Sequence, residues 1–208
     1  MLRSFPCKYS CTLLERTRRT GRALLGVAVS CALLVAAFSG AAAGTAIAAR
    51  SSCGAADLRP SAGDAARVAS ATLCLVDRLR AAHHLRPLQA NRALGKVAAS
   101  QVATMIRKDY FADVRPSGQT PMSLVAATSY KSHASAISVA ETLAWGTGPD
   151  ATAARIVAQW MASPPHRELI LAGEFRDAGV AVMPAVPSVV ARGKHGATYA
   201  IELGARWF

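Results

Sequence analysis

The chain has 208 residues and carries 24 Lys and Arg against 12 Asp and Glu, a formal net charge of +12. The basic residues are scattered, and no aromatic residues interleave with them, which argues against the basic-aromatic stripe of a specific nucleic-acid-binding surface. Residues 1–48 hold six Lys and Arg and one Glu, so the rest of the chain retains a charge of +7, on a length that suits one globular core.

The N-terminal 48 residues have the pattern of a secretory leader. A basic segment ending at Arg22 precedes an uncharged stretch over residues 23–49, and Ala46-Ile47-Ala48 offers a small-x-small cleavage site. This pattern predicts a signal peptide over residues 1–48, export by the Sec route and a secreted, extracellular product. The alternative is a retained N-terminal membrane anchor, because an uncharged stretch of this length could cross a bilayer.

Cysteine usage agrees with export. Three of the five cysteines lie within the leader, and only Cys53 and Cys74 remain after cleavage. An even pair in an exported chain favours a disulfide, which would close a loop of about 20 residues. Two free thiols, with Cys74 simply buried on its helix, remain the alternative.

Downstream of the leader, helices and strands are expected to alternate in one domain over residues 64–208, after a flexible Ser/Gly/Ala/Pro tail over residues 49–63. Helices are predicted over residues 64–84 and 91–108, capped by Asp64 and Asn91, with a short one starting at Thr120-Pro121. A fourth helix is expected after a cap at Asp150. Strands are predicted near residues 136–144, 178–186 and 197–205 from their alternating apolar residues.

Two features in the second half of the chain carry potential chemistry. Glu141 shares the parity of Ile137, Val139 and Leu143, so it would face the apolar side of its strand. A carboxylate there is costly unless it is paired. The Trp-bearing fourth helix should end at Ser163-Pro164-Pro165 and present His166 just after the break. His166 is therefore the natural partner of Glu141, in a structural pair or in a functional site.

This stretch resembles the CAP superfamily, whose members include cysteine-rich secretory proteins, insect-venom allergens and plant pathogenesis-related proteins. The resemblance is closest to the short bacterial SCP-like branch and runs from about Thr72 to the C-terminus. The matching positions are Glu141, Leu143, Ala144, Trp160, Ser163, Pro164, His166, Arg167, Ile170 and Leu171. The resemblance implies an α+β fold, a three-layer α-β-α sandwich with a small, mostly antiparallel sheet.

The resemblance also implies a central cavity, and this chain differs from the family in the residues expected there. Asp113 stands where the family usually has its first cavity histidine, and Gln101 where a further histidine is common. Asp113, Glu141 and His166 would form an oxygen-rich set able to hold a divalent cation, with calcium or magnesium favoured over zinc. Alternatively, Asp113 caps a turn, and Glu141 and His166 are only a buried pair. Glu202 is expected to be solvated, on the strand face opposite Tyr199, Ile201 and Leu203.

Three functions remain open at this stage. The first is a non-catalytic, monomeric binding module for a lipid, a sterol-like ligand or an envelope polymer, with no membrane contact after cleavage. The second is a metal-dependent hydrolase or peptidase, in which Glu141 acts as base and Asp113 and His166 as ligands. The third is a structural envelope protein. Serine chemistry has little basis, because the sequence contains no Gly-x-Ser-x-Gly segment.

Overall fold

A computed structural model describes residues 53–208, and the predicted leader and the first part of the tail lie outside the described residues. Its centre is a four-stranded sheet in the order β1-β3-β4-β2. The strands are β1 (Gln89–Ala90), β2 (Ala136–Thr147), β3 (Asp177–Met183) and β4 (Gly196–Trp207). β4 pairs antiparallel with both β2 and β3, and only the short β1 runs parallel to its neighbour. The expected small, mostly antiparallel sheet is confirmed.

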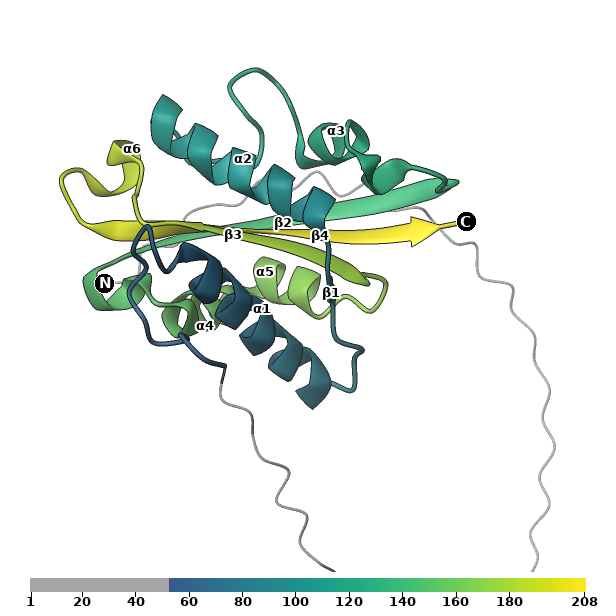
Figure 1. Ribbon diagram of the computed structural model, residues 1–208, viewed down its shortest axis with the longest axis horizontal. Helices are drawn as coiled ribbons and strands as arrows, with labels where there is room; N and C mark the ends of the chain where they lie inside the picture. Colours follow the sequence, from purple (N-terminus) through teal and green to yellow (C-terminus); the bar gives the residue numbers. More distant parts are fainter. Residues whose placement is uncertain (1–52) are drawn as a thin grey trace, which may run out of the picture. The chain divides into compact units, whose positions relative to one another are not determined.

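Helices cover both faces of the sheet (Figure 1). α2 (Arg92–Lys108) and α3 (Pro121–Ala126) lie on one face. The other face carries α1 (Ala65–Ala82), α4 (Ala153–Ala162) and α5 (Pro164–Ile170). The remaining helical turns are η1 (Ser129–Lys131), η2 (Gly148–Ala151) and α6 (Ser188–Ala191). The α+β, three-layer α-β-α architecture is therefore confirmed.

Successive side chains along β2 and β4 point to opposite faces of the sheet, so the core on each face contains different residues. Ala144, Tyr199, Ile201 and Leu203 join the core under α1 and α4. Leu143 and Ala200, which have the opposite parity, pack with Ala98, Val102 and Met105 of α2. Since both faces are covered, the three long strands bury residues on both sides.

Two of the predicted caps form capping hydrogen bonds, and Asp64 occupies the N-cap position of α1 without making one. The side chain of Asn91 accepts hydrogen bonds from the backbone N–H groups of Ala93 and Leu94, and Thr120 forms a capping box with Ser123 at the start of α3. The predicted cap at Asp150 is wrong. Asp150 lies within η2, and Thr152 caps α4 through the N–H of Arg155.

The predicted break after the fourth helix starts a new helix. Pro164 and Pro165 occupy the first positions of α5, where the missing N–H of proline costs no hydrogen bond. His166 therefore lies in the first turn of α5 and not in a loop after the break.

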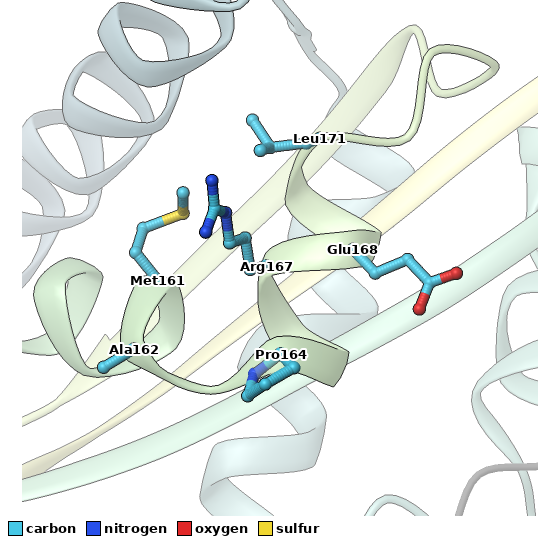
Figure 2. Close-up of a pocket in the computed structure, with 6 residues that line it drawn as sticks. All are labelled: Met161, Ala162, Pro164, Arg167, Glu168 and Leu171. Carbon is cyan, nitrogen blue, oxygen red and sulfur yellow. The ribbon is translucent and has the colours of Figure 1, made fainter.

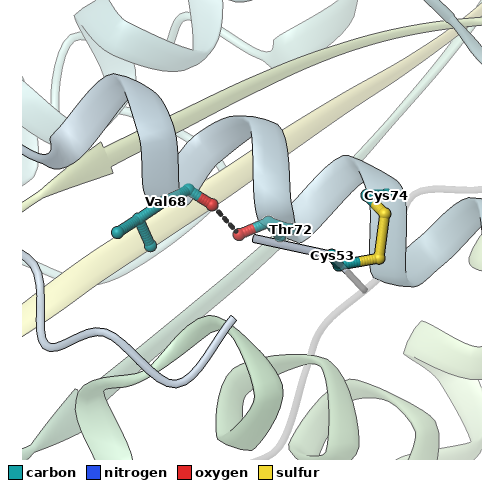
Figure 3. Close-up of a disulfide and its surroundings, with 4 residues drawn as sticks. All are labelled: Cys53, Val68, Thr72 and Cys74. Atoms are coloured by element: carbon teal, nitrogen blue, oxygen red, sulfur yellow. Dashed lines mark hydrogen bonds between the residues drawn. A yellow bond between two sulfur atoms is a disulfide. The ribbon is translucent and has the colours of Figure 1, made fainter. Parts of the chain in front are cut away.

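The predicted disulfide is confirmed. Cys53 and Cys74 are joined, with their Cα atoms 5.7 Å apart, and the bond attaches residue 53 to the middle of α1 (Figure 3). Ala55 and Leu58 pack against the main core, so this part of the predicted flexible tail lies on the domain. The Thr72 hydroxyl, beside the disulfide, donates to the Val68 carbonyl at 2.8 Å.

Arg80 is a buried basic residue that joins α1 to the segment after α5. Its side chain is 0% exposed, and its guanidinium donates to the carbonyl oxygens of Arg86, Ile170, Ala172 and Phe175 at 2.7–3.1 Å. The last three acceptors hold the end of α5 and the segment after it against α1, and Arg86 belongs to the segment that follows α1. None of the helices in the described part of the chain is long and apolar enough to cross a membrane.

Candidate functional site

Two buried glutamates lie side by side in the sheet. Glu141 of β2 is directly opposite Glu202 of β4 in the strand register. Glu141 has the parity of Leu143 and Glu202 that of Ala200, so both carboxyl groups face α2. They are 7% and 0% exposed. The sequence correctly predicts the face of Glu141, whereas the expectation that Glu202 is solvated is wrong.

The segment after α2 covers this pair, and Gln101 of α2 holds the segment in place. The Gln101 amide nitrogen donates to the carbonyls of Ala112 and Asp113, at 2.9 and 3.1 Å, while its oxygen accepts from Arg115 Nε at 2.9 Å. Gln101 itself is fully buried. At the position where the resemblance suggests histidine, this chain thus has an amide that positions a loop.

Burial governs the protonation of the carboxyl groups. It raises the pKa of Glu141 well above its usual value, and repulsion from Glu202 and Asp113 adds to this. Burial also raises the pKa of Glu202 to about 7 and that of Asp113 to about 6. The positive charge of Arg115 lowers the pKa values of both glutamates but does not offset burial.

The carboxyl oxygens of both glutamates are buried, and no N–H or O–H group within residues 53–208 donates a hydrogen bond to them. A hydrogen bond between the two glutamates requires that they share a proton. Such a bond raises the pKa of Glu141, the donor, and lowers the pKa of Glu202, the acceptor. The buried hydroxyl of Tyr110 lies near enough for the charge of Glu141 to raise its pKa, after the larger effect of burial. The site is therefore a buried acidic cluster in which burial and mutual repulsion disfavour ionisation of both glutamates.

His166 is not the partner of Glu141, which corrects the pair expected from the sequence. α5, which carries His166, packs with α1 and α4 through Ile170 on the other face of the sheet (Figure 1). Nδ1 of His166 lies 2.9 Å from the hydroxyl oxygen of Ser163, in hydrogen-bonding distance. Burial lowers the pKa of His166. The histidine consequently belongs to the local structure where α4 meets α5.

The predicted cation-binding set is not assembled. Asp113 and Glu141 interact, but His166 lies across the sheet from them. Among the residues that the structure describes, no three His, Cys, Asp or Glu side chains are grouped as a metal ion would require. Cation binding by Asp113 and Glu141 stays a prediction from the sequence.

Two hollows in the described part of the chain lie on the face opposite the glutamates. A groove of about 470 Å³ runs between α1 and α4. Its walls are mostly apolar, with one basic residue, and comprise Leu75, Arg78, Leu79, Ala154, Val157, Ala158 and Met161. Sequence patterns do not reveal it, because a groove depends on how far apart two helices pack.

A second pocket of about 310 Å³ adjoins the groove, since Met161 lines both. Figure 2 shows the side chains of Met161, Arg167 and Leu171 turned towards a common space, with Glu168 pointing away from it. Arg78 lines the larger hollow and Arg167 the smaller one. We call the larger hollow, between α1 and α4, the α1–α4 groove.

Comparisons with known proteins agree with this architecture. The family model described as cysteine-rich secretory protein family, or CAP, matches residues 73–187, more than half of the chain. An outer surface protein of Borrelia burgdorferi is similar in structure, with a TM-score of 0.51 and 20% sequence identity. The similarity covers 64% of this chain and 89% of that protein.

An extracellular protein of Bacillus anthracis that contains an SCP domain is also similar, with a TM-score of 0.50 and 19% identity over 69% of this chain. The similarity covers only 40% of that protein. At such identities these structures demonstrate a shared fold. A search of curated proteins found no match.

Proposed function

Because this chain belongs to the cysteine-rich secretory protein (CAP) family, we propose that it is a secreted, non-catalytic module that binds a lipid carrying an acyl chain. Export is supported by the leader pattern of residues 1–48 and by the Cys53–Cys74 disulfide, since disulfides persist in oxidising compartments. The similar Bacillus anthracis protein is described as extracellular.

The α1–α4 groove is the observation that carries the proposal. Its volume of about 470 Å³, with a further 310 Å³ in the adjoining pocket, falls within the usual range for small-molecule sites. Leu75, Leu79, Val157 and Met161 supply apolar contacts along it. Transferring an acyl chain from water onto such a surface is favourable by about 0.8 kcal/mol for each buried CH₂ group.

The charged residues of the groove suit an anionic head group. Arg78 lines its α1 side, and Arg167 lines the adjoining pocket. Both residues are exposed, so a carboxylate or phosphate could reach either guanidinium while the chain lies between the helices. An amphipathic anion with one apolar tail matches this combination.

The geometry gives less support to the alternative, a metal-dependent hydrolase. That mechanism needs Glu141, Asp113 and His166 around one water, but Glu141 and His166 lie on opposite faces of the sheet. Glu202 is 0% exposed and Glu141 only 7%, so a polymer substrate cannot contact these carboxyl groups in this conformation. The glutamates are better explained as part of the folded core.

The proposal can be tested by titrating the purified protein with a fluorescent fatty acid. Ala158 is exposed on α4 and lines the groove, so Ala158→Trp should fill the groove and abolish saturable binding. Ala99→Trp provides the matched control, because Ala99 is exposed on α2 on the opposite face. Equal binding by both variants would contradict the proposed site, and absence of binding to the unsubstituted protein would contradict the proposed ligand.

A further inference from the structure

The outer side of α2 carries a line of basic residues. Arg92, Lys96 and Arg107 are all exposed, and at 100° per residue their positions fall within about 60° of one another around the helix. Over 15 residues at 1.5 Å rise, the line extends for roughly 22 Å. The positions between them on this side include only the small residues Ala99, Ser100 and Ala103.

Arg115 fills the gap in this line from a different segment of the chain. Its Nη2 group donates to the hydroxyl of Ser100 at 2.9 Å, and its Nε group donates to Gln101. Ser100 lies between Lys96 and Arg107 along α2, so the guanidinium of Arg115 is fixed between these two residues. We call Arg92, Lys96, Arg107 and Arg115 the α2 basic stripe.

The stripe residues of α2 have no counter-charge on their own helix. α2 contains no acidic residue, and the ion pairs within residues 53–208, Arg67 with Asp64 and Arg206 with Asp177, involve no residue of the stripe. Asp109, at the end of α2, accepts a hydrogen bond from the N–H of Val189. Arg115 also interacts with the buried Glu141 and Glu202, whereas no ion pair within residues 53–208 involves Arg92, Lys96 or Arg107. The exposed cations of α2 therefore create a local positive potential.

We propose that the α2 basic stripe is a docking surface for a linear polyanion, such as an anionic polymer of the cell envelope. A row of guanidinium and ammonium groups fits the repeated phosphates or carboxylates of an extended chain. A membrane surface fits less well, because a helix that lies in a membrane directs its apolar side towards the lipid. The apolar side of α2, with Leu94, Val97 and Val102, is buried on the sheet.

This surface is independent of the proposed lipid site. The stripe and the α1–α4 groove lie on opposite sides of the sheet (Figure 1), so each can fail its test without affecting the other. A domain with both sites would hold a lipid on one side while attached to an envelope polymer on the other.

Binding of polyphosphate and of polygalacturonate by the purified protein, measured at several salt concentrations, tests the proposal. Affinity should fall linearly with salt on logarithmic axes, because bound polyanions release counterions. The variant Arg92→Glu/Lys96→Glu should lose about tenfold or more in affinity and show a shallower salt dependence. Binding of polyphosphate alone would identify phosphate as the recognised group, and binding of both polymers would identify a general polyanion site.

The matched control is Arg59→Glu/Arg155→Glu, which changes the net charge equally at exposed positions, Arg155 being on α4. It should retain affinity within about threefold, since only long-range charge effects are removed. Equal losses in the two variants would overturn the proposal, because net charge alone would then explain binding. Binding to phosphatidylglycerol vesicles through the stripe, without binding to either polymer, would also overturn it. Melting temperatures show whether both variants fold. If Arg92→Glu/Lys96→Glu does not fold, Arg92→Gln/Lys96→Gln replaces it.

Discussion

Glu141 and Glu202 show how a sheet can accommodate two acids in its interior. Opposite each other on neighbouring strands and shielded from water, they cannot both be ionised without strong repulsion. Protonation of one of them removes this repulsion, and burial favours the protonated form by raising the pKa of both. The pair therefore makes the fold sensitive to pH.

The sign of this effect follows from the raised pKa values. An acid whose pKa is higher in the folded chain binds its proton more tightly there, so its contribution to stability is complete at low pH and is lost as pH rises. For Glu202 this loss runs from its usual value of 4.5 to about 7, and for Asp113 from 3.8 to about 6. His166, whose pKa is lowered by burial, acts in the opposite direction below 6.5.

Glu202→Gln should consequently stabilise the protein at pH 8 and have little effect near pH 5. The glutamine is neutral at every pH, so the variant no longer loses stability when the second carboxyl group ionises. Urea denaturation across this pH range measures the difference, with Glu168→Gln on the exposed side of α5 as control. A difference between variant and unsubstituted protein that does not change with pH would show that the pair does not share a proton.

At the scale of single residues, the sequence predicts which face of a strand a side chain lies on better than it predicts which residues that side chain contacts. Alternation along β2 correctly directs Glu141 towards an apolar layer, and the Cys53–Cys74 pair follows from the leader pattern. The partner of Glu141 could not be predicted, because parity does not reveal which helix layer covers a face. The burial of Glu202 could not be predicted for the same reason. The sequence of β4 alternates in the same way whether its second face is exposed to solvent or covered by a helix.

At the scale of elements, the close contact of α2 with β3 depends on a glycine in β3. A Cβ atom on Gly179 of β3 would overlap the backbone of Leu94 and Gly95, whereas a Cβ atom on Gly95 would meet nothing within 4 Å. The absence of a side chain at Gly179 thus allows α2 to approach the sheet closely, next to the loop that covers the glutamates.

Alanine substitutions at the two glycines should have opposite effects. Gly179→Ala should destabilise the fold by about 3 kcal/mol, because backbone atoms cannot move aside as a flexible side chain can. Gly95→Ala should be neutral or stabilise by up to about 1 kcal/mol, since alanine favours a helix interior. Chemical denaturation of both variants measures these changes. Similar effects at the two positions would contradict the close packing of α2 on β3.

The disulfide attaches the N-terminal segment to α1 and should add to the stability of the fold. Cys53 and Cys74 are 21 residues apart, and opening a loop of this size should cost about 3 kcal/mol in the chain-entropy estimate. Reduction should therefore lower the melting temperature of the protein. The variant Cys53→Ser/Cys74→Ser should have the lower value with or without reductant. A melting temperature that reduction leaves unchanged would show that the bond adds no stability.

The sequence predicts the elements well where local chemistry fixes them. The caps Asn91 and Thr120 start α2 and α3 as expected, and the three long strands lie within a few residues of their predicted positions. The two-residue strand β1 and the role of Arg80 are not predictable in this way. Both depend on distant backbone, namely β3 for the strand and the carbonyls after α5 for the arginine.

At the scale of the whole domain, the sheet separates two surfaces with different properties. One layer carries the α1–α4 groove with its apolar walls, and the other carries the α2 basic stripe. The buried glutamates lie between the sheet and α2, so they belong to neither surface. Neither the proposed lipid site nor the proposed polyanion site therefore requires the buried acids.

The central claim is that a lipid binds between α1 and α4, and mapping amide chemical shifts during a titration with oleate tests it most directly. We expect saturable shifts that cluster on Leu75, Arg78, Val157, Ala158 and Met161, with α2 and α3 unchanged. Shifts concentrated around α2 and the Glu141–Glu202 pair, or no shifts at saturating oleate, would contradict it.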